Sequence, residues 1–342
     1  MDIKAALAQI ADRQDLSLAE MQDVMGQIMT GAASDAQIGA FLMGLRMKGE
    51  TLDEITGAVM VMRSLASAVD VPGDNLVDIV GTGGDGANLF NVSTAASFVV
   101  AAAGGRVAKH GNRSVSSSSG SADVLEAAGV SLDLQPAQVV ACIEKIGVGF
   151  MFAPAHHSAM RHAIGPRREM GLRTIFNILG PMTNPAGVKR LLIGVYDQAL
   201  CRPVAEVLMR LGAERVLVVH SADGLDEISA AASTHMTEGG LDGITEYEIA
   251  PSDFDLPLTP LDGLEVAGAL ESLDLIRAAL SGAPGDLAER ARRVVALNAG
   301  AALYVAGLHE SIADGVAAAQ RLLQSGKPWL TVEALADFTA AL

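Results

Sequence analysis

The sequence predicts an α/β protein in two parts: a small all-helical N-terminal domain and a large α/β domain with a mainly parallel central sheet. Three observations support this class. Residues 3 to about 68 show helical periodicity only. From residue 73, short β-branched runs alternate with helical segments, as in parallel sheets covered on both faces. The length of 342 residues fits one large and one smaller domain. We therefore expect domains at 1–72 and 73–342.

The N-terminal part is expected to be a four-helix unit. Ser17 with Glu20, and Thr51 with Glu54, have the spacing of a capping box, and each pair opens an amphipathic run. A unit of this size buries little surface by itself. We therefore expect its remaining apolar side chains, between positions 38 and 45, to pack against the rest of the chain or a second subunit.

The second part carries the alternating strands and helices. Strands are predicted at 76–80, 106–108, 191–195 and 216–219, and helices at 94–103, 122–128, 137–146, 200–211 and 287–306. In such sheets ligands bind at the carboxyl ends of the strands. Functional residues are therefore expected just after the predicted strands.

Composition excludes several classes of function. Lys and Arg number 24 against 40 Asp and Glu, a net charge of −16, which argues against nucleic acid as a partner because duplex affinity relies on basic residues. Cys142 and Cys201 lie in no metal-binding or redox spacing, which excludes a disulfide scaffold and a zinc-thiolate site. No apolar run reaches the roughly 20 residues that cross a bilayer, and no secretion signal is visible. We expect a soluble, cytoplasmic protein without a membrane partner.

The first segment with chemical content is Asp-Ile-Val-Gly-Thr-Gly-Gly-Asp-Gly at 78–86, followed by Asn-Val-Ser-Thr at 91–94 and an Ala-rich helix. Glycines let backbone N–H groups close around phosphate oxygens, and a helix N-terminus adds positive potential. The spacing fits neither a dinucleotide-binding fingerprint nor a Walker loop. An ordinary tight turn, with Asn91 or Ser93 as helix cap, is the alternative interpretation.

The second segment, 109–121, combines an ammonium, a guanidinium and many hydroxyl and amide donors with no acid. This mixture suits an anion with several oxygens, and we expect Lys109 to contact a phosphate. His110 fits a ligand contact or a structural role equally well.

The third segment contains Asp226 and Glu227, just past the predicted strand 216–219. Neighbouring residues of a strand face opposite ways, so both carboxylates reach one metal only from a loop, which Gly224 favours. Magnesium prefers carboxylates, water and ligand phosphates. A solvent-exposed acidic turn is the alternative.

The fourth segment, 165–185, has three arginines within seven residues of an otherwise acidic chain. The guanidinium fork matches a carboxylate, so we expect at least one arginine to bind an acidic ligand. For Arg168 and Arg173 we expect pairing with surface acids.

Taken together, the four segments resemble the anthranilate phosphoribosyltransferase family over essentially the full chain. The motifs that carry the resemblance are GTGGD at 81–85, NVST at 91–94, KHGNRSVSSSSGSADVLEA from 109, RREMG from 167, TNP at 183–185 and DE at 226–227. The resemblance implies a nucleoside phosphorylase/phosphoribosyltransferase-like fold, with the helical domain completed by helices from about 165–185. It also implies a homodimer formed through that domain.

The resemblance further implies transfer of the phosphoribosyl group of 5-phosphoribosyl 1-pyrophosphate to the amine of anthranilate in tryptophan biosynthesis, with Mg²⁺ as cofactor. The implied donor-binding residues are Gly81, Gly84, Asp85, Asn91, Val92, Ser93, Thr94, Lys109, His110, Gly111, Asn112, Arg113, Ser117 and Ser121. Anthranilate is expected at Gly81, Asn112 and Arg167, and the metal at Ser93, Asp226 and Glu227. Lys109, Asp226 and Glu227 are the expected catalytic residues. Leu89 stands where the family usually has a small hydroxyl residue, so one hydrogen bond to the donor is in question.

An aryl amine is neutral at pH 7, and no Ser-His-Asp or Cys-His arrangement is visible, so we expect catalysis to be mainly electrostatic.

Two alternative functions remain. A pyrimidine nucleoside phosphorylase would use inorganic phosphate and has no evident need of Arg167 near Asn112. A noncatalytic nucleic-acid-binding relative would be basic and would lack the acidic pair.

Overall fold

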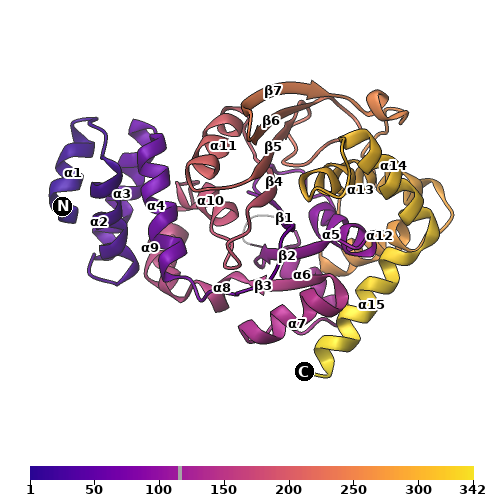
Figure 1. Cartoon of the computed structure of the whole chain (residues 1–342). Helices are drawn as coiled ribbons and strands as arrows, with labels where there is room; N and C mark the ends of the chain where they lie inside the picture. The colour runs from indigo at the N-terminus through magenta and orange to yellow at the C-terminus, as the bar shows by residue number, and fades with distance from the viewer. Residues whose placement is uncertain (115–117) are drawn as a thin grey trace.

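The computed structural model describes residues 1–114 and 118–342 and places a helical domain beside a larger α/β domain (Figure 1). The expected donor contact Ser117 lies outside the described residues. Within the described ranges, no helix is long and apolar enough to span a membrane.

Four helices form the N-terminal domain: α1 (Ile3–Ala11), α2 (Leu18–Met29), α3 (Asp35–Lys48) and α4 (Leu52–Leu65). Both predicted capping boxes are confirmed, at the starts of α2 and α4. A third, between Ser34 and Gln37, opens α3 and was not predicted. Helix α2 packs on α4, and α1 on α3.

Further along the chain, α9 (Arg161–Met170) returns to this domain and packs against α3 and α2. Four apolar side chains of α3 that were expected to need a partner, Ile38, Phe41, Leu42 and Leu45, are buried within the single chain. Residues distant in sequence therefore complete the core of the helical domain.

One buried acid ties the start of α2 to α4. The Glu54 carboxylate accepts hydrogen bonds from the backbone N–H groups of Leu16 (2.9 Å) and Thr51 (2.8 Å). It also pairs with the buried Lys48 ammonium at 3.0 Å. Glu54 is fully buried, so its charge relies on these partners.

The large domain contains a seven-stranded sheet in the order β3-β2-β1-β4-β5-β6-β7. The strands are β1 (Leu76–Gly81), β2 (Arg106–Gly111), β3 (Val148–Phe152), β4 (Arg190–Gly194), β5 (Arg215–Ser221), β6 (Thr234–Gly240) and β7 (Gly243–Ile249). The first five pair in parallel and the last two antiparallel. The mainly parallel sheet is confirmed. Strands β3, β6 and β7 were missed because they are glycine-containing or polar and lack a β-branched run.

Helices cover both faces of the sheet. The helices of this domain, some of which pack on other helices, are α5 (Val92–Ala102), α6 (Ser121–Ala127), α7 (Pro136–Ile146), α8 (Ala153–His156), α10 (Phe176–Leu179), α11 (Cys201–Arg210), α12 (Ala269–Leu280), α13 (Asp286–Val305), α14 (Ile312–Ser325) and α15 (Lys327–Ala340). Figure 1 shows α11 and α13 on opposite sides of the sheet. The five helices predicted in this domain are confirmed to within two residues at each end.

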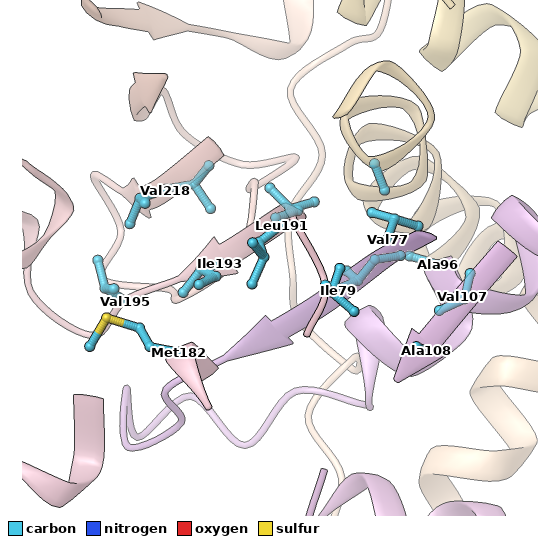
Figure 2. Packing of buried hydrophobic residues seen from close by; sticks show 14 of the residues in the cluster. Val77, Ile79, Ala96, Val107, Ala108, Met182, Leu191, Ile193, Val195 and Val218 are labelled. Atoms are coloured by element: carbon cyan, nitrogen blue, oxygen red, sulfur yellow. The ribbon is translucent and has the colours of Figure 1, made fainter. Parts of the chain in front are cut away.

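The core lies on both faces of the central strands. Val77 and Ile79 of β1 are buried on one face, with Ala96 of α5 close to β1, and Leu191 and Ile193 of the neighbouring β4 are buried on the other (Figure 2). Burial on both faces explains why these strands read as continuous apolar runs rather than alternating ones.

Glu54→Ala should lower the free energy of unfolding by about 2–4 kcal/mol, because it leaves the backbone donors of Leu16 and Thr51 unpaired and removes one of the two carboxylates that pair with Lys48, the other being Asp15. Denaturant unfolding of the purified chain measures this. Asp53→Ala is the matched control, since it removes only an exposed ion pair to Arg210 and should cost less than about 1 kcal/mol. Equal losses in the two variants would contradict the assignment.

Candidate active site

The site begins where β1 and β2 separate. These strands pair only at Leu76–Arg106 and Val77–Val107, although β1 continues along β4 to Gly81 and β2 continues along β3 to Gly111. The two strands therefore diverge toward their carboxyl ends, the edge of a parallel sheet where ligands bind.

Two buried polar side chains hold the diverging strands. The Asp78 carboxylate accepts from the His110 N–H (3.2 Å) and from the Asn184 amide (2.7 Å), which also donates to the Ala108 carbonyl (2.8 Å). Burial raises the pKa of Asp78 to about 6. Sequence reasoning gave neither Asp78 nor Asn184 a role, although both lie in the quoted segments. A polar residue inside a buried strand was the available signal.

Lys109 lies in the gap between the strands. Its buried ammonium donates to the Ile79 carbonyl (2.6 Å) and to the Ser93 hydroxyl (3.2 Å) at the start of α5. Burial lowers the pKa of Lys109, while the Asp78 and Glu227 carboxylates oppose that shift. The ammonium is thus directed at the N-terminus of α5.

The glycine turn (residues 81–86) connects β1 toward α5. Gly83, Gly84 and Gly86 have φ of +66°, +80° and +80°, a left-handed conformation that other residues rarely adopt. The Gly83 N–H donates to the Asp226 carboxylate at 2.6 Å. Asp85, on the same turn, accepts from the Ala87 N–H at 3.2 Å. The glycines are therefore needed for backbone geometry.

The acidic pair lies in the loop after β5, as expected, but the alternative of a solvent-exposed turn is wrong. Asp226 is buried and the Glu227 carboxylate accepts from the Ser93 N–H at 3.2 Å. Burial and then the neighbouring Asp85 raise the pKa of Asp226 to about 7. Burial and Asp226 raise the pKa of Glu227 well above its ordinary value. The two acids form a cluster of mutually repelling carboxylates suited to a cation.

Two glycines on adjacent strands make room for this loop. A Cβ atom on Gly81 would collide with the Asp226 carboxylate, and one on Gly194 with the Asp226 backbone carbonyl. Gly194 was not singled out from the sequence, because its need for glycine arises only from a segment more than 30 residues away.

Asn91 connects the glycine turn to the serine-rich segment and to α12. Its amide donates to the Ser119 carbonyl (3.1 Å), and its carbonyl oxygen accepts from the hydroxyls of Ser119 (2.9 Å) and Ser272 (2.7 Å). Asn91 occupies the N-cap position of α5, as one interpretation of the sequence had it, but its side chain makes no capping hydrogen bond. Val92 and Thr94 follow in the first turn of α5, both buried.

Other residues expected at the donor lie differently. Arg113 pairs with Glu126 (2.8 Å) and Asp123 (3.1 Å) of α6, so its guanidinium faces that helix rather than the glycine turn. The Ser121 hydroxyl donates to the Asn112 carbonyl at 3.4 Å, beside Gly111.

His110 is buried, and its ring lies 5.1 Å from that of His157. Burial and the nearby histidines lower the pKa of His110 to about 3, and within the described part of the chain its Nε2 has no partner. A neutral ring with a free nitrogen is compatible with either role considered from the sequence.

The three arginines have different surroundings. Arg167 on α9 is half-buried, 5.1 Å from the centre of the Phe176 ring, and burial lowers its pKa. The expectation that Arg168 and Arg173 pair with surface acids is wrong: neither forms an ion pair with any described residue. Arg173 instead donates to the Gly84 carbonyl and lies 4.3 Å from the Tyr196 ring centre.

Leu89, which departs from the family pattern, is half-buried against the core and forms a β-bridge with Glu265. On either side of it, the Phe90 N–H donates to the Leu264 carbonyl (3.1 Å) and the Val266 N–H to the Asn88 carbonyl (2.9 Å). Here the position packs rather than presenting a hydroxyl.

Comparison with known proteins gives one consistent result. Residues 4–66 match the helical bundle domain of a glycosyl transferase family, and residues 73–329 its a/b domain. The chain is 63% identical over 340 residues to anthranilate phosphoribosyltransferase of Saccharophagus degradans, covering 99% of this chain and 100% of that protein.

Comparison with solved structures points to the same family. Anthranilate phosphoribosyltransferase from Thermus thermophilus superposes with a TM-score of 0.91 at 41% identity, covering 98% of this chain and 99% of that one. The Saccharomyces cerevisiae enzyme, solved in complex with phosphoribosyl pyrophosphate and Mg, has a TM-score of 0.89 at 25% identity, covering 99% of this chain and 98% of that one.

Gly194→Ala should lower the free energy of unfolding by about 1–3 kcal/mol, because the added methyl group displaces the Asp226 backbone from β4. Thermal or denaturant unfolding measures this. Gly180→Ala is the control, since an added Cβ there meets nothing within 4 Å. If Gly194→Ala is no more destabilising than Gly180→Ala, the Asp226 loop is not held against β4.

Proposed function

The chain belongs to the anthranilate phosphoribosyltransferase family, and we propose that its active site lies at the carboxyl ends of β1, β2 and β5. The chain transfers the phosphoribosyl group of 5-phosphoribosyl 1-pyrophosphate to the amine of anthranilate, giving N-(5-phosphoribosyl)anthranilate and pyrophosphate, in tryptophan biosynthesis. The observation that carries the location is the convergence of the glycine turn, Lys109 and the acidic pair on the start of α5.

Donor binding is assigned to the residues that the family resemblance implies, centred on the glycine turn and the first turn of α5. Backbone N–H groups there and the Lys109 ammonium offer positive potential to the pyrophosphate. For Arg113 to take part, its guanidinium would have to leave Glu126 and Asp123.

The acidic residues fit Mg²⁺. Asp226 is buried and Glu227 half-buried beside Asp85, and burial, followed by repulsion between the acids, raises both pKa values. A divalent cation would relieve that repulsion. Within the described ranges, no three His, Cys, Asp or Glu side chains are placed to hold a metal by themselves, so donor oxygens and the Ser93 hydroxyl would complete the coordination. When bound, Mg²⁺ supplies positive charge that neutralises the pyrophosphate.

The acceptor is assigned to Arg167, with Asn112 and Gly81. Arg167 is half-buried and forms no ion pair with a described acid, so its guanidinium fork is available to the anthranilate carboxylate. Within the described residues no hydrogen bond joins Arg167 to Asn112 or Gly81. The bound anthranilate would contact all three.

In this reaction the amine nitrogen forms a bond to the anomeric carbon as the bond to pyrophosphate breaks, and the nitrogen then loses a proton. The neutral amine needs positioning more than a strong base. Negative charge grows on the leaving group, and Lys109 and the turn N–H groups are placed to stabilise it. Lys109, Asp226 and Glu227 are therefore the proposed catalytic residues.

The helical region 1–72, completed by residues from about 165–185, is proposed as the interface of a homodimer, and 73–342 as the donor-binding domain. Met43 and Met47 of α3 and Met60 of α4 are exposed apolar side chains in that region. A biosynthetic enzyme with these small-molecule substrates is expected in the cytoplasm.

The direct test mixes the purified protein with Mg²⁺, anthranilate and phosphoribosyl pyrophosphate and follows loss of anthranilate fluorescence. A parallel reaction with thymidine and inorganic phosphate tests the phosphorylase alternative. Turnover in the second assay and none in the first would refute the proposed function.

Asp226→Asn combined with Glu227→Gln should sharply reduce kcat and raise the Mg²⁺ concentration needed for half-maximal rate, because both anionic ligands are lost. The fold should remain, since the change also removes repulsion between neighbouring acids. Rates over a magnesium titration, with an unfolding curve as control, measure this. An unchanged magnesium dependence would remove the pair from the metal site.

Arg167→Ala should raise the anthranilate KM while leaving the donor KM nearly unchanged, because the carboxylate contact is similar in the ground and transition states. A charged hydrogen bond is worth about 1.5–3 kcal/mol. Arg167→Lys should recover only part of the loss. Aniline, which lacks the carboxylate, serves as control acceptor: equal damage to aniline and anthranilate turnover would make Arg167 structural.

A further inference from the structure

Arg173 lies in a short connection between α9 and α10, and the proposed chemistry gives it no part. It follows Gly171, whose φ of +60° ends α9. The side chain is exposed, yet it pairs with no described acid. An exposed arginine in an acidic chain ordinarily pairs with a carboxylate, so the contacts that Arg173 makes instead need an explanation.

The guanidinium of Arg173 packs on the glycine turn. It donates to the carbonyl of Gly84 and lies 4.3 Å from the centre of the Tyr196 ring. A Cβ on Gly84 would come within 3.3 Å of Arg173 Nε, so the guanidinium occupies the space beside that glycine. Tyr196 is itself tied to the turn, since its N–H donates to the Thr82 hydroxyl at 3.1 Å.

The backbone of Arg173 is held from the other side. Its carbonyl accepts a hydrogen bond from Arg46, in the last turn of α3. A continuous chain of contacts therefore runs from the helical domain, through Arg173, to Gly84.

The consequence for the turn follows from the planar trans peptide. The carbonyl of Gly84 and the N–H of Asp85 belong to one peptide unit and point in opposite directions. A Gly84 carbonyl held toward Arg173 therefore leaves the Asp85 N–H pointing to the opposite side of the turn. The partially negative carbonyl oxygen is kept away from that side. The left-handed glycines 83, 84 and 86 restrict the backbone little by themselves, so the orientation of each peptide depends on contacts such as this one.

We propose that Arg173 is a positioning residue that orients the Gly84–Asp85 peptide of the glycine turn for the donor pyrophosphate and connects that turn to α3. The inference rests on the proposed function, because it takes the turn to be the donor site. Arg173 acts through the turn and need not touch substrate.

Arg173→Ala should raise the KM of phosphoribosyl pyrophosphate about tenfold while the anthranilate KM and kcat change less than about twofold, as expected for lost ground-state binding. Calorimetric binding of phosphoribosyl pyrophosphate with Mg²⁺, without anthranilate, should weaken by the same factor. Arg173→Lys should recover part of the loss, because lysine keeps the charge but not the planar fork. Arg168→Ala, five residues away on α9, exposed and without an ion pair to a described residue, is the matched control and should behave as wild type.

A second pair of variants tests the connection to α3. Arg46→Ala should raise the donor KM in the same direction by a smaller factor, and Arg46→Ala with Arg173→Ala should be no worse than Arg173→Ala alone. If the donor KM of the double variant instead rises by the product of the two single-variant factors, the two arginines act independently and the proposed connection through Arg173 to α3 is wrong.

The outcomes separate this inference from the proposed function. A wild-type protein that neither binds the donor nor turns it over would refute the function. An active wild type in which Arg173→Ala equals Arg168→Ala overturns the inference. So does an Arg173→Ala variant that raises both KM values together and lowers the unfolding temperature, since that marks a general structural role.

Discussion

The divergence of β1 from β2 is the constraint on which the site depends. Backbone pairing between them ends at Val77 and Val107, and the Asp78 carboxylate with the Asn184 amide satisfies groups left unpaired. Buried backbone donors and acceptors that lose a ladder partner need another one, and these side chains supply it. The opening then admits the Lys109 side chain, whose ammonium reaches the start of α5.

Charge in the site is balanced locally rather than by the chain as a whole. The net charge of −16 opposes polyanions at long range, but screening limits that effect to roughly 8 Å at physiological salt. At the site, the Asp78 and Glu227 carboxylates both act on the Lys109 ammonium, and Asp85 acts on Asp226. A buried cluster with more acids than bases favours an added cation, which matches the chemistry of a magnesium-bound pyrophosphate.

The two domains share the segment that follows β3. Helix α9 packs on α3 and α2, whereas Asn184, further along, is bonded inside the sheet at Asp78 and Ala108. Arg167 therefore comes from the helical side and Lys109 from the sheet. An acceptor held by the first and a donor held near the second would meet where the domains adjoin, which is the arrangement a two-substrate transfer requires.

The sequence by itself determined the class of fold, the helix starts marked by Ser17 and Thr51, and the glycine turn, because capping, periodicity and left-handed glycines are local requirements. It also indicated that Asp226 and Glu227 lie in a loop. Only the tertiary structure decided that Asp226 is buried and Glu227 half-buried, that Gly194 must lack a side chain, that Arg113 faces α6 and that Arg173 bonds Gly84. Each depends on segments far apart in the chain, and burial and partner choice arise only when packing brings such segments together.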